Sequence, residues 1–279
     1  MKILITGGRG FIGRRLQKEL SKDAGNTVCL LVLEQDKDKG DEKLKCVVVG
    51  DICDGKLDLS EYDVIYHLAA IANPRVCEQE KELAWKTNTY GTINILERMR
   101  IGARIVFMSS AHVYGNSEKP HKEDEEPDPQ NFYGFTKEIG ERAINHYAKT
   151  KGVKRTIFRL FNSYSADQPE GFIVPDVIKK YKIQKLVEIL NPNGEIDLVH
   201  IDDAVSVLAA ASKKSLDGTF NICSGKPMRI REVYSAIRKF TGASGVAEKD
   251  VKKEGSKKSL GDNSKISALG FKFRNFSLP

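Results

Sequence analysis

The sequence predicts an α/β protein built on a doubly wound parallel sheet, followed by a smaller C-terminal lobe. Three observations support this fold class. The chain opens with an apolar strand that leads through a glycine-rich turn into an amphipathic helix. Apolar runs and helical periods then alternate as far as Asn162, as they do where helices join parallel strands. Beyond Asn162 the elements become shorter, and the C-terminal stretch is rich in Lys, Gly and Ser.

The glycine-rich turn has the features of a dinucleotide phosphate site. Residues 3–5 form an unbroken apolar run, typical of a strand buried on both faces. Gly7, Gly10 and Gly13 then stand three apart, so that no side chain obstructs a ligand there. Helical spacing resumes after the turn and brings the N–H groups of a helix N-terminus beside it. A tight turn without a ligand is the alternative, but a second apolar run at 28–33 favours a dinucleotide-binding βαβ unit.

The remaining elements of the first half follow in alternation. The pattern predicts strands at 28–33, 46–49, 64–70, 104–108 and 156–160, and helices at 77–99 and 132–149. The segment 35–43 is too charged and too poor in apolar periodicity for a core element. In a sheet of this kind we expect ligands at the carboxyl ends of the strands.

The second half predicts shorter elements. These are a helix after Pro175, a strand near 186–190, a segment at 197–200, a helix from Asp203, a strand at 219–223 and a helix at 229–240. We expect residues 1–165, with a return segment 196–224, to form a dinucleotide-binding domain of Rossmann type. Residues 166–195 and 225–279 would form a substrate-binding lobe.

The composition narrows the classes of partner. The net charge is +7, and five lysines lie within 249–258, while basic and acidic residues interleave elsewhere. We therefore expect no nucleic-acid partner. No apolar run approaches membrane-spanning length, and the chain starts on a strand and not on a signal peptide. We expect a cytoplasmic protein without membrane contact.

The cysteines and histidines show no metal-ligand pattern. Five cysteines, an odd number without a CxxC pair, are expected to be reduced thiols of a cytosolic protein: Cys29, Cys46, Cys53, Cys77 and Cys223. No His, Cys and carboxylate cluster has ligand spacing, so no metal site is expected. His67 and His200 are interpreted as structural.

Reactive side chains follow two of the predicted elements. The segment 109–115 comes directly after the strand 104–108 and supplies two serine hydroxyls at its end. Tyr133 and Lys137 stand four apart near the start of a helix, which places phenol and ammonium on one face. A nearby ammonium favours phenolate and would lower the tyrosine pKa, making it a general base or acid. An exposed Tyr–Lys pair without such a role is the alternative.

These motifs together resemble the extended short-chain dehydrogenase/reductase family, specifically the NAD-dependent epimerase/dehydratase group that acts on nucleotide sugars. The matching segments occur in the same order as in that group: 6–13, 50–52, 66–70, Asn88 with 91–92, 109–115, Tyr133 with Lys137, 159–162 and 199–203. They span nearly the whole chain.

The resemblance implies roles for single residues. Ser110 would hydrogen-bond the reacting sugar hydroxyl, Tyr133 would be the base, and Lys137 would hold the nicotinamide ribose and lower the tyrosine pKa. Ala111 and His112 would adjoin the sugar, and Asn162 would contact the substrate diphosphate. The implied cofactor contacts are Gly7, Arg9, Gly10, Phe11, Ile12, Gly13, Glu34, Asp51, Ile52, Leu68, Ala69, Ala70, Tyr133 and Lys137.

The chain also departs from the group. Dehydratases carry Asp-Glu after the serine, whereas this chain has Ala111-His112, so a 4,6-dehydratase is not expected. Ile196 replaces a diphosphate-binding Arg, and Lys253 stands near a second one. Ser165-Ala166 replaces Gly-Pro. We therefore expect a nucleotide-diphosphate sugar to bind in an altered way.

Two residue questions stay open. His112 aligns with an acid/base cysteine of fucose-synthase-like members, with Asp167 near the partner histidine; a side chain that only lines the pocket is the favoured interpretation. For the cofactor, Glu34 would accept the ribose hydroxyls of NAD, although alignment from Gly25 puts Val32 there. Arg9, Lys37 and Lys39 would suit the 2′-phosphate of NADP. We expect NAD.

Three functions follow from the sequence. The first is an NAD(P)-dependent nucleotide-sugar epimerase, most simply at C4, which forms a transient keto sugar. The second is a 4-keto-sugar-nucleotide reductase, which needs the same Ser110, Tyr133 and Lys137. The third is a non-catalytic dinucleotide sensor or RNA-binding relative, against which the intact Ser-Tyr-Lys set argues. By resemblance, the helices 77–99 and 132–149 would pair in a homodimer.

Overall fold

The structure is a computed structural model that describes residues 1–37, 46–251 and 258–278. Its contacts divide the chain into two compact units. The first unit comprises Met1–Gly115, Glu126–Arg159 and Val205–Phe220; the second comprises Asn116–Glu125, Leu160–Ala204 and Asn221–Pro279. These bounds assign 116–125 to the second unit and shorten the return segment to 205–220. The dinucleotide-binding and substrate-binding roles given to the two domains stay predictions.

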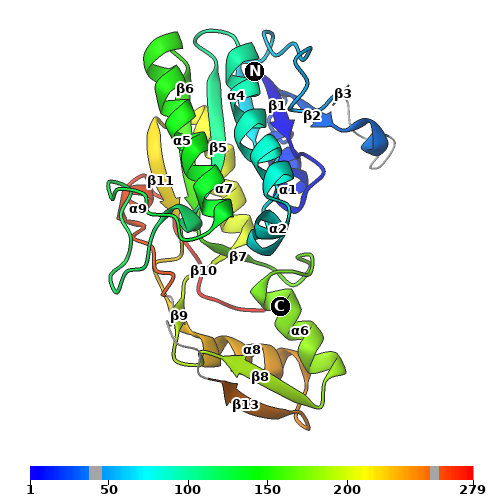
Figure 1. Cartoon of the computed structure of the whole chain (residues 1–279), viewed down its shortest axis with the longest axis vertical. Coiled ribbons are helices and arrows are strands. Elements are labelled where there is room, and N and C mark those ends of the chain that lie inside the picture. Colours follow the sequence, from blue (N-terminus) through cyan, green and yellow to red (C-terminus); the bar gives the residue numbers. More distant parts are fainter. Residues whose placement is uncertain (38–45, 252–257, 279) are drawn as a thin grey trace. The chain divides into compact units, whose positions relative to one another are not determined.

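A seven-stranded sheet organises the first unit (Figure 1). Its strands are β1 (Lys2–Thr6), β2 (Thr27–Val32), β3 (Val47–Val49), β4 (Val64–His67), β5 (Arg104–Ser110), β6 (Lys154–Leu160) and β11 (Gly218–Ile222). Their order is β11-β6-β5-β4-β1-β2-β3, and β1 pairs in parallel with both β2 and β4. The chain thus leaves β1 toward one edge and later returns beside it toward the other. The strand order reverses between β1 and β4, where sheets of this class bind ligands.

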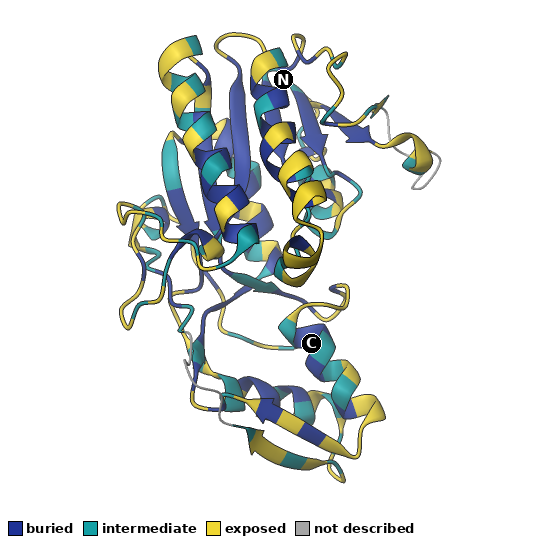
Figure 2. Cartoon of the chain, viewed as in Figure 1, coloured by how far each residue is buried: buried dark blue, intermediate teal, exposed yellow. Residues whose placement is uncertain are grey.

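Helices cover both faces of the sheet. They include α1 (Phe11–Leu20), α4 (Gly91–Arg98), α5 (Phe132–Lys151) and α7 (Ile201–Lys213). Ile65 of β4 shares one core cluster with Ile95 of α4 and Ile144 of α5, and Figure 2 shows the buried sides of these two helices turned toward the strands. Its neighbour Tyr66 points to the opposite face, where its hydroxyl donates to Ser212 of α7 at 3.1 Å. The predicted doubly wound sheet is confirmed.

The predicted helix 77–99 is interrupted. The structure has α2 (Pro74–Gln79), α3 (Lys81–Ala84), a π-helical turn η2 (Trp85–Tyr90) and then α4. Glu80, between α2 and α3, leaves helical geometry with φ −117° and ψ 56°. The wider π turn carries the buried polar residues Asn88 and Thr89. One extra residue in a helical turn barely alters the apolar periodicity, so the sequence pattern does not reveal the π turn. Such turns are frequent at functional sites.

The second unit is assembled from short elements. Its core joins α6 (Ile173–Ile183), β8 (Leu186–Leu190) and α8 (Ile230–Thr241). β8 alternates exposed and buried residues and pairs in parallel with β13 (Ala247–Val251), a strand that the sequence analysis did not predict. The smaller pairs are β7 (Asn162–Tyr164) with β10 (Leu198–His200), and β9 (Glu195–Ile196) with β12 (Met228–Arg229). A short helix, α9 (Ser264–Ser267), follows.

The expectation of five reduced thiols is wrong in this structure. Cys29 and Cys46 form a disulfide, with their Cα atoms 4.6 Å apart. They meet because β2 and β3 are parallel neighbours with Leu30 opposite Val47, a tertiary pairing that cysteine spacing alone does not show. Cys53, Cys77 and Cys223 remain thiols.

Across the residues described, the structure has no helix long and apolar enough to cross a membrane.

Candidate active site

The turn between β1 and α1 forms a cradle without side chains. Gly7 has φ +67°, and a Cβ there would come within 2.8 Å of the backbone nitrogen of Ala69. A Cβ on Gly13 would lie 2.4 Å from the carbonyl oxygen of Gly7. Both positions therefore require glycine. Gly10 is the N-cap of α1 and provides no side-chain cap, which leaves the first N–H groups of the helix for another acceptor.

This cradle fits the pyrophosphate of a dinucleotide. Uncapped N–H groups and the positive end of a helix dipole suit phosphate oxygens, and the missing Cβ atoms let a ligand approach the backbone. Phe11 and Ile12 are half-buried in the first turn of α1. The structure thus gathers Gly7, Gly10, Phe11, Ile12 and Gly13 at the carboxyl end of β1, where the sequence predicted them.

The segment after β4 lies against the same turn. The backbone nitrogen of Ala69 donates to Thr6 Oγ1 at 3.1 Å, and that of Leu68 donates to the Thr6 carbonyl oxygen at 3.3 Å. His67 bridges Thr6 Oγ1 and Thr92 Oγ1 with its two ring nitrogens, at 2.8 and 2.9 Å. Burial lowers the pKa of His67 to about 3, so it is neutral and serves the structural role expected.

The carboxyl end of β3 carries Asp51 and Ile52. Asp51 is exposed, and its carboxylate accepts a hydrogen bond from the backbone nitrogen of Cys53 at 2.8 Å. Ile52 is buried, and its carbonyl accepts from Asn94 Nδ2 at 2.7 Å. Both residues belong to the first unit and sit at the carboxyl edge of the sheet. Their predicted adenine contact stays a prediction.

Glu34 does not end β2. It begins a 3₁₀ turn, η1 (Glu34–Asp36), after Val32 and Leu33, and its carboxylate forms an exposed ion pair with Lys37 at 2.6 Å. Arg9 reaches this turn from the glycine-rich segment, where its Nη2 donates to the carbonyl oxygen of Lys37 at 2.7 Å. Lys39 lies outside the described residues.

Ser110 and Tyr133 meet at the end of β5. Ser110 is buried and caps a 3₁₀ turn, η3 (Ala111–Val113), by accepting from the backbone nitrogen of His112 at 3.2 Å. Tyr133 lies in the first turn of α5. Burial raises the pKa of Tyr133 to about 12, against the smaller lowering effect of a hydrogen bond with Ser110. The predicted pair of hydroxyls is thus brought together.

Lys137 is buried one turn further along α5. Its Nζ donates to the Met108 carbonyl oxygen at 2.9 Å and lies 5.9 Å from the centre of the Tyr133 ring. Burial lowers the pKa of Lys137 to about 8. The expected lowering of the tyrosine pKa is not found, because burial dominates and the ammonium is engaged with Met108. The protein's own groups leave Tyr133 a neutral phenol at pH 7.

The helix and the η3 turn touch through Gly134. A Cβ there would lie 2.0 Å from the carbonyl oxygen of His112. Asn131 caps α5, because its Oδ1 accepts from the backbone nitrogen of Gly134 at 2.9 Å. Its Nδ2 must then donate to His112 Nδ1, 2.9 Å away. The imidazole of His112 also stands edge-on to the Tyr133 ring, with centroids 5.5 Å apart.

Two supporting residues escaped the sequence analysis. Asn131 was recognisable as an N-cap type directly before a predicted helix. Glu78 of α2 accepts from the backbone nitrogen of Phe132 at 2.7 Å, a contact that no local pattern indicates. Asn88, noted only as a matching residue, accepts from the backbone nitrogen of Ile71 at 2.8 Å and donates to Thr136 Oγ1 at 3.1 Å. It thereby ties the loop after β4 to α5.

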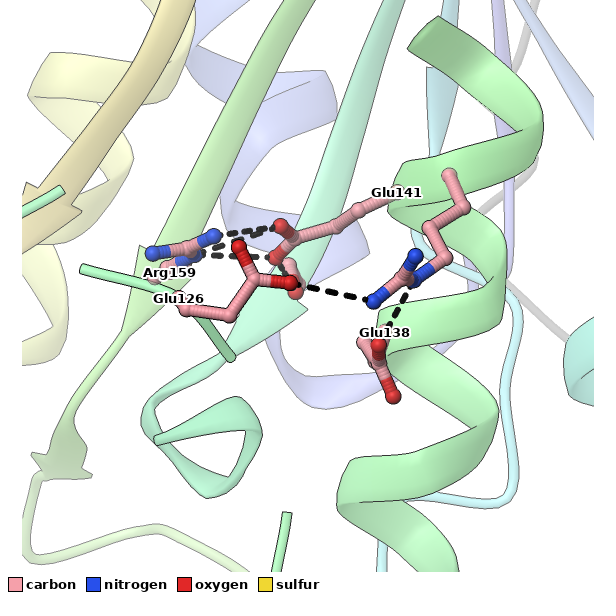
Figure 3. A network of polar contacts seen from close by, with 6 residues as sticks. Glu126, Glu138, Glu141 and Arg159 are labelled. Carbon is pink, nitrogen blue, oxygen red and sulfur yellow. Dashed lines mark hydrogen bonds and ion pairs between the residues drawn. The ribbon is translucent and has the colours of Figure 1, made fainter. Parts of the chain in front are cut away.

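A buried ion pair stands behind the serines (Figure 3). Arg159 Nη2 contacts Glu141 at 2.7 Å, and Ser109 Oγ donates to the same carboxylate at 2.5 Å. Both charged side chains are only 5% exposed. The Arg159 guanidinium also lies 4.7 Å from the centre of the Tyr114 ring. This network joins β5, α5 and β6 at Ser109, the residue before Ser110.

Asn162 belongs to the second unit. Its Nδ2 donates to the Asp197 carbonyl oxygen at 3.2 Å and to Ser259 Oγ at 3.0 Å. Lys253, predicted near a second diphosphate contact, falls outside the described residues. In the described part of the chain no group of three His, Cys, Asp or Glu side chains is placed to hold a metal ion.

Comparison with known proteins gives a consistent result. Residues 3–223 match the NAD dependent epimerase/dehydratase family. A putative UDP-glucose 4-epimerase of Methanocaldococcus jannaschii is 30% identical over 285 residues, covering 97% of this chain and 92% of the relative. A GDP-6-deoxy-D-talose 4-dehydrogenase of Aggregatibacter actinomycetemcomitans is 28% identical, covering 85% and 79%.

A solved structure extends the similarity to the whole fold. The UDP-glucuronic acid 4-epimerase of Bacillus cereus, in complex with UDP-glucuronic acid and NAD, superposes with a TM-score of 0.85 at 26% identity. The match covers 99% of this chain and 95% of that one. The resemblance drawn from the motifs is therefore confirmed: the chain belongs to the NAD dependent epimerase/dehydratase family.

Proposed function

We propose that the protein is an NAD-dependent 4-epimerase of nucleotide-diphosphate sugars. The observation that carries this proposal is the buried contact of Ser110 with Tyr133, one helical turn before Lys137. These groups stand at the carboxyl end of β5, in the sheet whose β1 end carries the glycine cradle. The two 4-epimerase names among the similar proteins support the position of the reaction.

In this proposal Tyr133 and Ser110 handle the proton. The C4 hydroxyl of the sugar would hydrogen-bond Ser110 and give its proton to the Tyr133 oxygen, while the C4–H bond breaks with loss of hydride. In this direction Tyr133 must be a phenolate, which burial disfavours and the positive charge of bound NAD would favour. NAD supplies the capacity to accept that hydride and to return it. If the hydride returns to the opposite face of the 4-keto sugar and Tyr133 gives its proton back to the sugar oxygen, the configuration at C4 is inverted. The sum is an isomerisation that consumes no cofactor.

The other expected roles complete the proposal. Lys137 would hold the nicotinamide ribose, Asp51 and Ile52 the adenine, and Leu68, Ala69 and Ala70 would line the dinucleotide by their backbone. Ala111 and His112 would adjoin the sugar, and Asn162 would contact the diphosphate.

A test follows absorbance near 340 nm, where reduced nicotinamide absorbs. The protein is mixed with NAD and with UDP-glucose or UDP-glucuronic acid, and the sugar products are separated. Transient reduction of NAD, a sugar product inverted at C4 and no net loss of NAD would together support the 4-epimerase. Tyr133→Phe should lower turnover about 10²–10⁴-fold, whereas Tyr147→Phe on the same helix should leave it unchanged. Equal turnover in both variants would contradict the mechanism.

The neutral phenol of Tyr133 favours a second candidate, a 4-keto-sugar-nucleotide reductase. A group with a pKa of about 12 is a proton donor at pH 7, as reduction of a ketone requires. The similar protein named a 4-dehydrogenase supports redox chemistry at the same carbon. Stoichiometric oxidation of NADH or NADPH by a 4-keto sugar nucleotide, without epimerisation, would establish this function instead.

The non-catalytic alternative is the least supported. A dinucleotide sensor or RNA-binding relative would need none of the three buried groups Ser110, Tyr133 and Lys137. The Tyr133→Phe variant can be expressed in a strain from which the gene has been deleted. Full complementation of the deletion phenotype by this variant would favour the sensor over both enzymes.

His112 has its own test. Because Asn131 donates to Nδ1, the proton of a neutral His112 imidazole lies on Nε2. An acid/base role predicts that His112→Ala lowers turnover and that His112→Gln does not restore it. Full turnover in His112→Ala would leave only a lining role.

A homodimer and a cytoplasmic location belong to the same proposal. In the homodimer, the helices α3–α4 and α5 of one copy would pack against the same helices of the second copy. The exposed side chains of Trp85 and Phe135, whose rings lie 6.1 Å apart, support this surface as the contact. Light scattering should give twice the chain mass, and Trp85→Glu should shift it toward the monomer.

A further inference from the structure

A third buried polar residue continues the stripe of Tyr133 and Lys137 on α5. Glu141 stands four residues after Lys137, which stands four after Tyr133, and residues at this spacing lie on one face of a helix. All three side chains are buried. A carboxylate is rarely found inside a protein unless it is paired or hydrogen-bonded. The contacts of Glu141 therefore indicate why a charge is kept on this face.

Each member of this stripe contacts a different residue at the end of β5. The three contacts are those of Tyr133 with Ser110, Lys137 with Met108 and Glu141 with Ser109. The last of these is short, with 2.5 Å between Ser109 Oγ and the Glu141 carboxylate. Because Ser109 and Ser110 are neighbours in the chain, a hydrogen bond that fixes the first on α5 restricts the movement of the second relative to Tyr133.

Arg159 of β6 fixes the Glu141 carboxylate in turn (Figure 3). Its Nε lies 3.1 Å and 3.2 Å from the two carboxylate oxygens, and its Nη2 lies 2.7 Å from one of them. Hydrogen bonds from a guanidinium favour the ionised carboxylate and restrict its rotation. Glu141 therefore has a fixed place and a negative charge inside the first unit.

The charge of Glu141 acts on Lys137, one helical turn away. Burial lowers the pKa of Lys137 to about 8, whereas Cys77 of α2 and Glu141 raise it. Burial also raises the pKa of Cys77, so this group is an uncharged thiol at neutral pH. His67 of β4 and Tyr133, which also face Lys137, are neutral as well. Among these groups, Glu141 is therefore the anion that favours the Lys137 ammonium at neutral pH.

We propose that Glu141 is a positioning residue for the reaction. It acts through Ser109, which it ties to α5 beside Ser110, and through Lys137, which its carboxylate keeps in the ammonium form. Glu141 itself would touch neither the sugar nor the cofactor. The inference rests on the proposed function, since it concerns the groups that would handle the proton of the sugar.

The first test measures the ionisation of Lys137 without substrate. The chemical shift of the lysine Cε carbon reports the charge of the amine, and the signal missing from Lys137→Met assigns Lys137. Glu141→Gln should move the titration midpoint of Lys137 down by about one pH unit, because the anion is lost while Arg159 stays charged. Arg159→Met should move the midpoint up. The control is Glu138→Gln, which removes another buried carboxylate of α5, paired with Arg142, and should leave the midpoint unchanged.

The second test separates positioning from a loss of folding. The double variant Glu141→Gln with Arg159→Met removes both charges of the pair, so neither is left buried alone. Its kcat should fall about tenfold to a hundredfold, while its KM for the nucleotide sugar changes less than about threefold. Ser109→Ala should lower kcat without moving the midpoint of Lys137, because it removes only the hydrogen bond that anchors β5.

The inference is overturned if Glu141→Gln leaves the midpoint of Lys137 at its wild-type value, or if the double variant turns over as fast as wild type. Movement of the midpoint in the same direction by Glu141→Gln and Arg159→Met would also overturn it, because this would report a disturbed fold and not a charge. If wild type turns over no nucleotide sugar, the proposed function fails, and the titration still decides whether Glu141 keeps Lys137 charged.

Discussion

The Lys137 ammonium donates a hydrogen bond to the backbone carbonyl oxygen of Met108, at 2.9 Å, inside the protein. This contact ties α5 to β5 immediately before Ser109 and Ser110. It also holds a cation where burial disfavours charge, since the pKa of Lys137 falls to about 8. Two ionisable residues of the candidate site, Lys137 and Tyr133, are thus both displaced toward their neutral forms.

The Lys137 pKa makes stability depend on pH. An unfolded lysine has a pKa of about 10.4, so between about pH 8 and 10.4 the unfolded chain binds more protons than the folded one. The free energy of unfolding therefore rises with pH in this window, and the contribution is lost as pH falls through about 8. We expect wild type to gain stability relative to Lys137→Met between pH 7 and pH 10.

Urea denaturation at both pH values would measure this gain. Lys149→Met, an exposed change on the same helix, is the control and should show no such trend. If the difference in unfolding free energy between wild type and Lys137→Met did not change with pH, this would contradict the burial of a charged lysine at neutral pH.

The Glu141–Arg159 pair predicts a large loss for one substitution. Arg159→Met leaves the buried Glu141 carboxylate without its cation and should cost about 3–5 kcal/mol of unfolding free energy. Arg142→Met removes a side chain that is 61% exposed from its contacts with Glu138 and Glu126 and should cost at most about 1 kcal/mol.

Chemical denaturation of both variants measures the difference. Adding Glu141→Gln to Arg159→Met should recover part of the loss, because glutamine carries no charge and can still accept from Ser109. Equal losses of unfolding free energy in Arg159→Met and Arg142→Met would show that the buried ion pair contributes no more to stability than the exposed one.

Gly134→Ala should inactivate the protein although it lies in a helix. Alanine normally favours a helix over glycine by about 1 kcal/mol. Here its Cβ would stand 2.0 Å from the His112 carbonyl oxygen, a backbone atom with little freedom to move, so overpacking should prevail. We expect lower stability and a large loss of turnover, because Tyr133 shifts with the helix.

Gly245→Ala, at an exposed site with nothing within 4 Å, is the matched control. Thermal unfolding and turnover of the two variants decide the question. A Gly134→Ala protein as stable and active as wild type would disprove the close approach of α5 to η3.

The disulfide predicts a thiol count. Denatured protein that has not been reduced should react with a thiol reagent at three cysteines, and at all five after reduction, because Cys29 and Cys46 are joined. Cys46→Ser should raise the unreduced count by one, since Cys29 becomes a thiol. Five reactive thiols without reduction, in protein purified under air, would show that the bond does not form.

Local patterns carried much of the architecture. The apolar run 3–5, the spacing of Gly7, Gly10 and Gly13, and the helical period after them depend on residues a few positions apart. Backbone sterics and side-chain alternation act over that range, so the sequence sufficed for the β1–turn–α1 unit and for the strand and helix order. The four-residue spacing of Tyr133 and Lys137 was likewise a local property of one helix.

What only the tertiary structure decided depends on groups far apart in the sequence. The disulfide between Cys29 and Cys46 follows from strand pairing. The ion pair of Glu141 with Arg159 follows from the packing of a helix on the sheet, and the neutral state of Tyr133 follows from burial. Glu34 forms an exposed ion pair with Lys37, and two buried donors of Arg9 have no partner among the described residues. The sequence by itself determined which side chains are present at the strand ends; their charge and their partners were decided by desolvation and long-range contacts, because both arise only when distant segments come together.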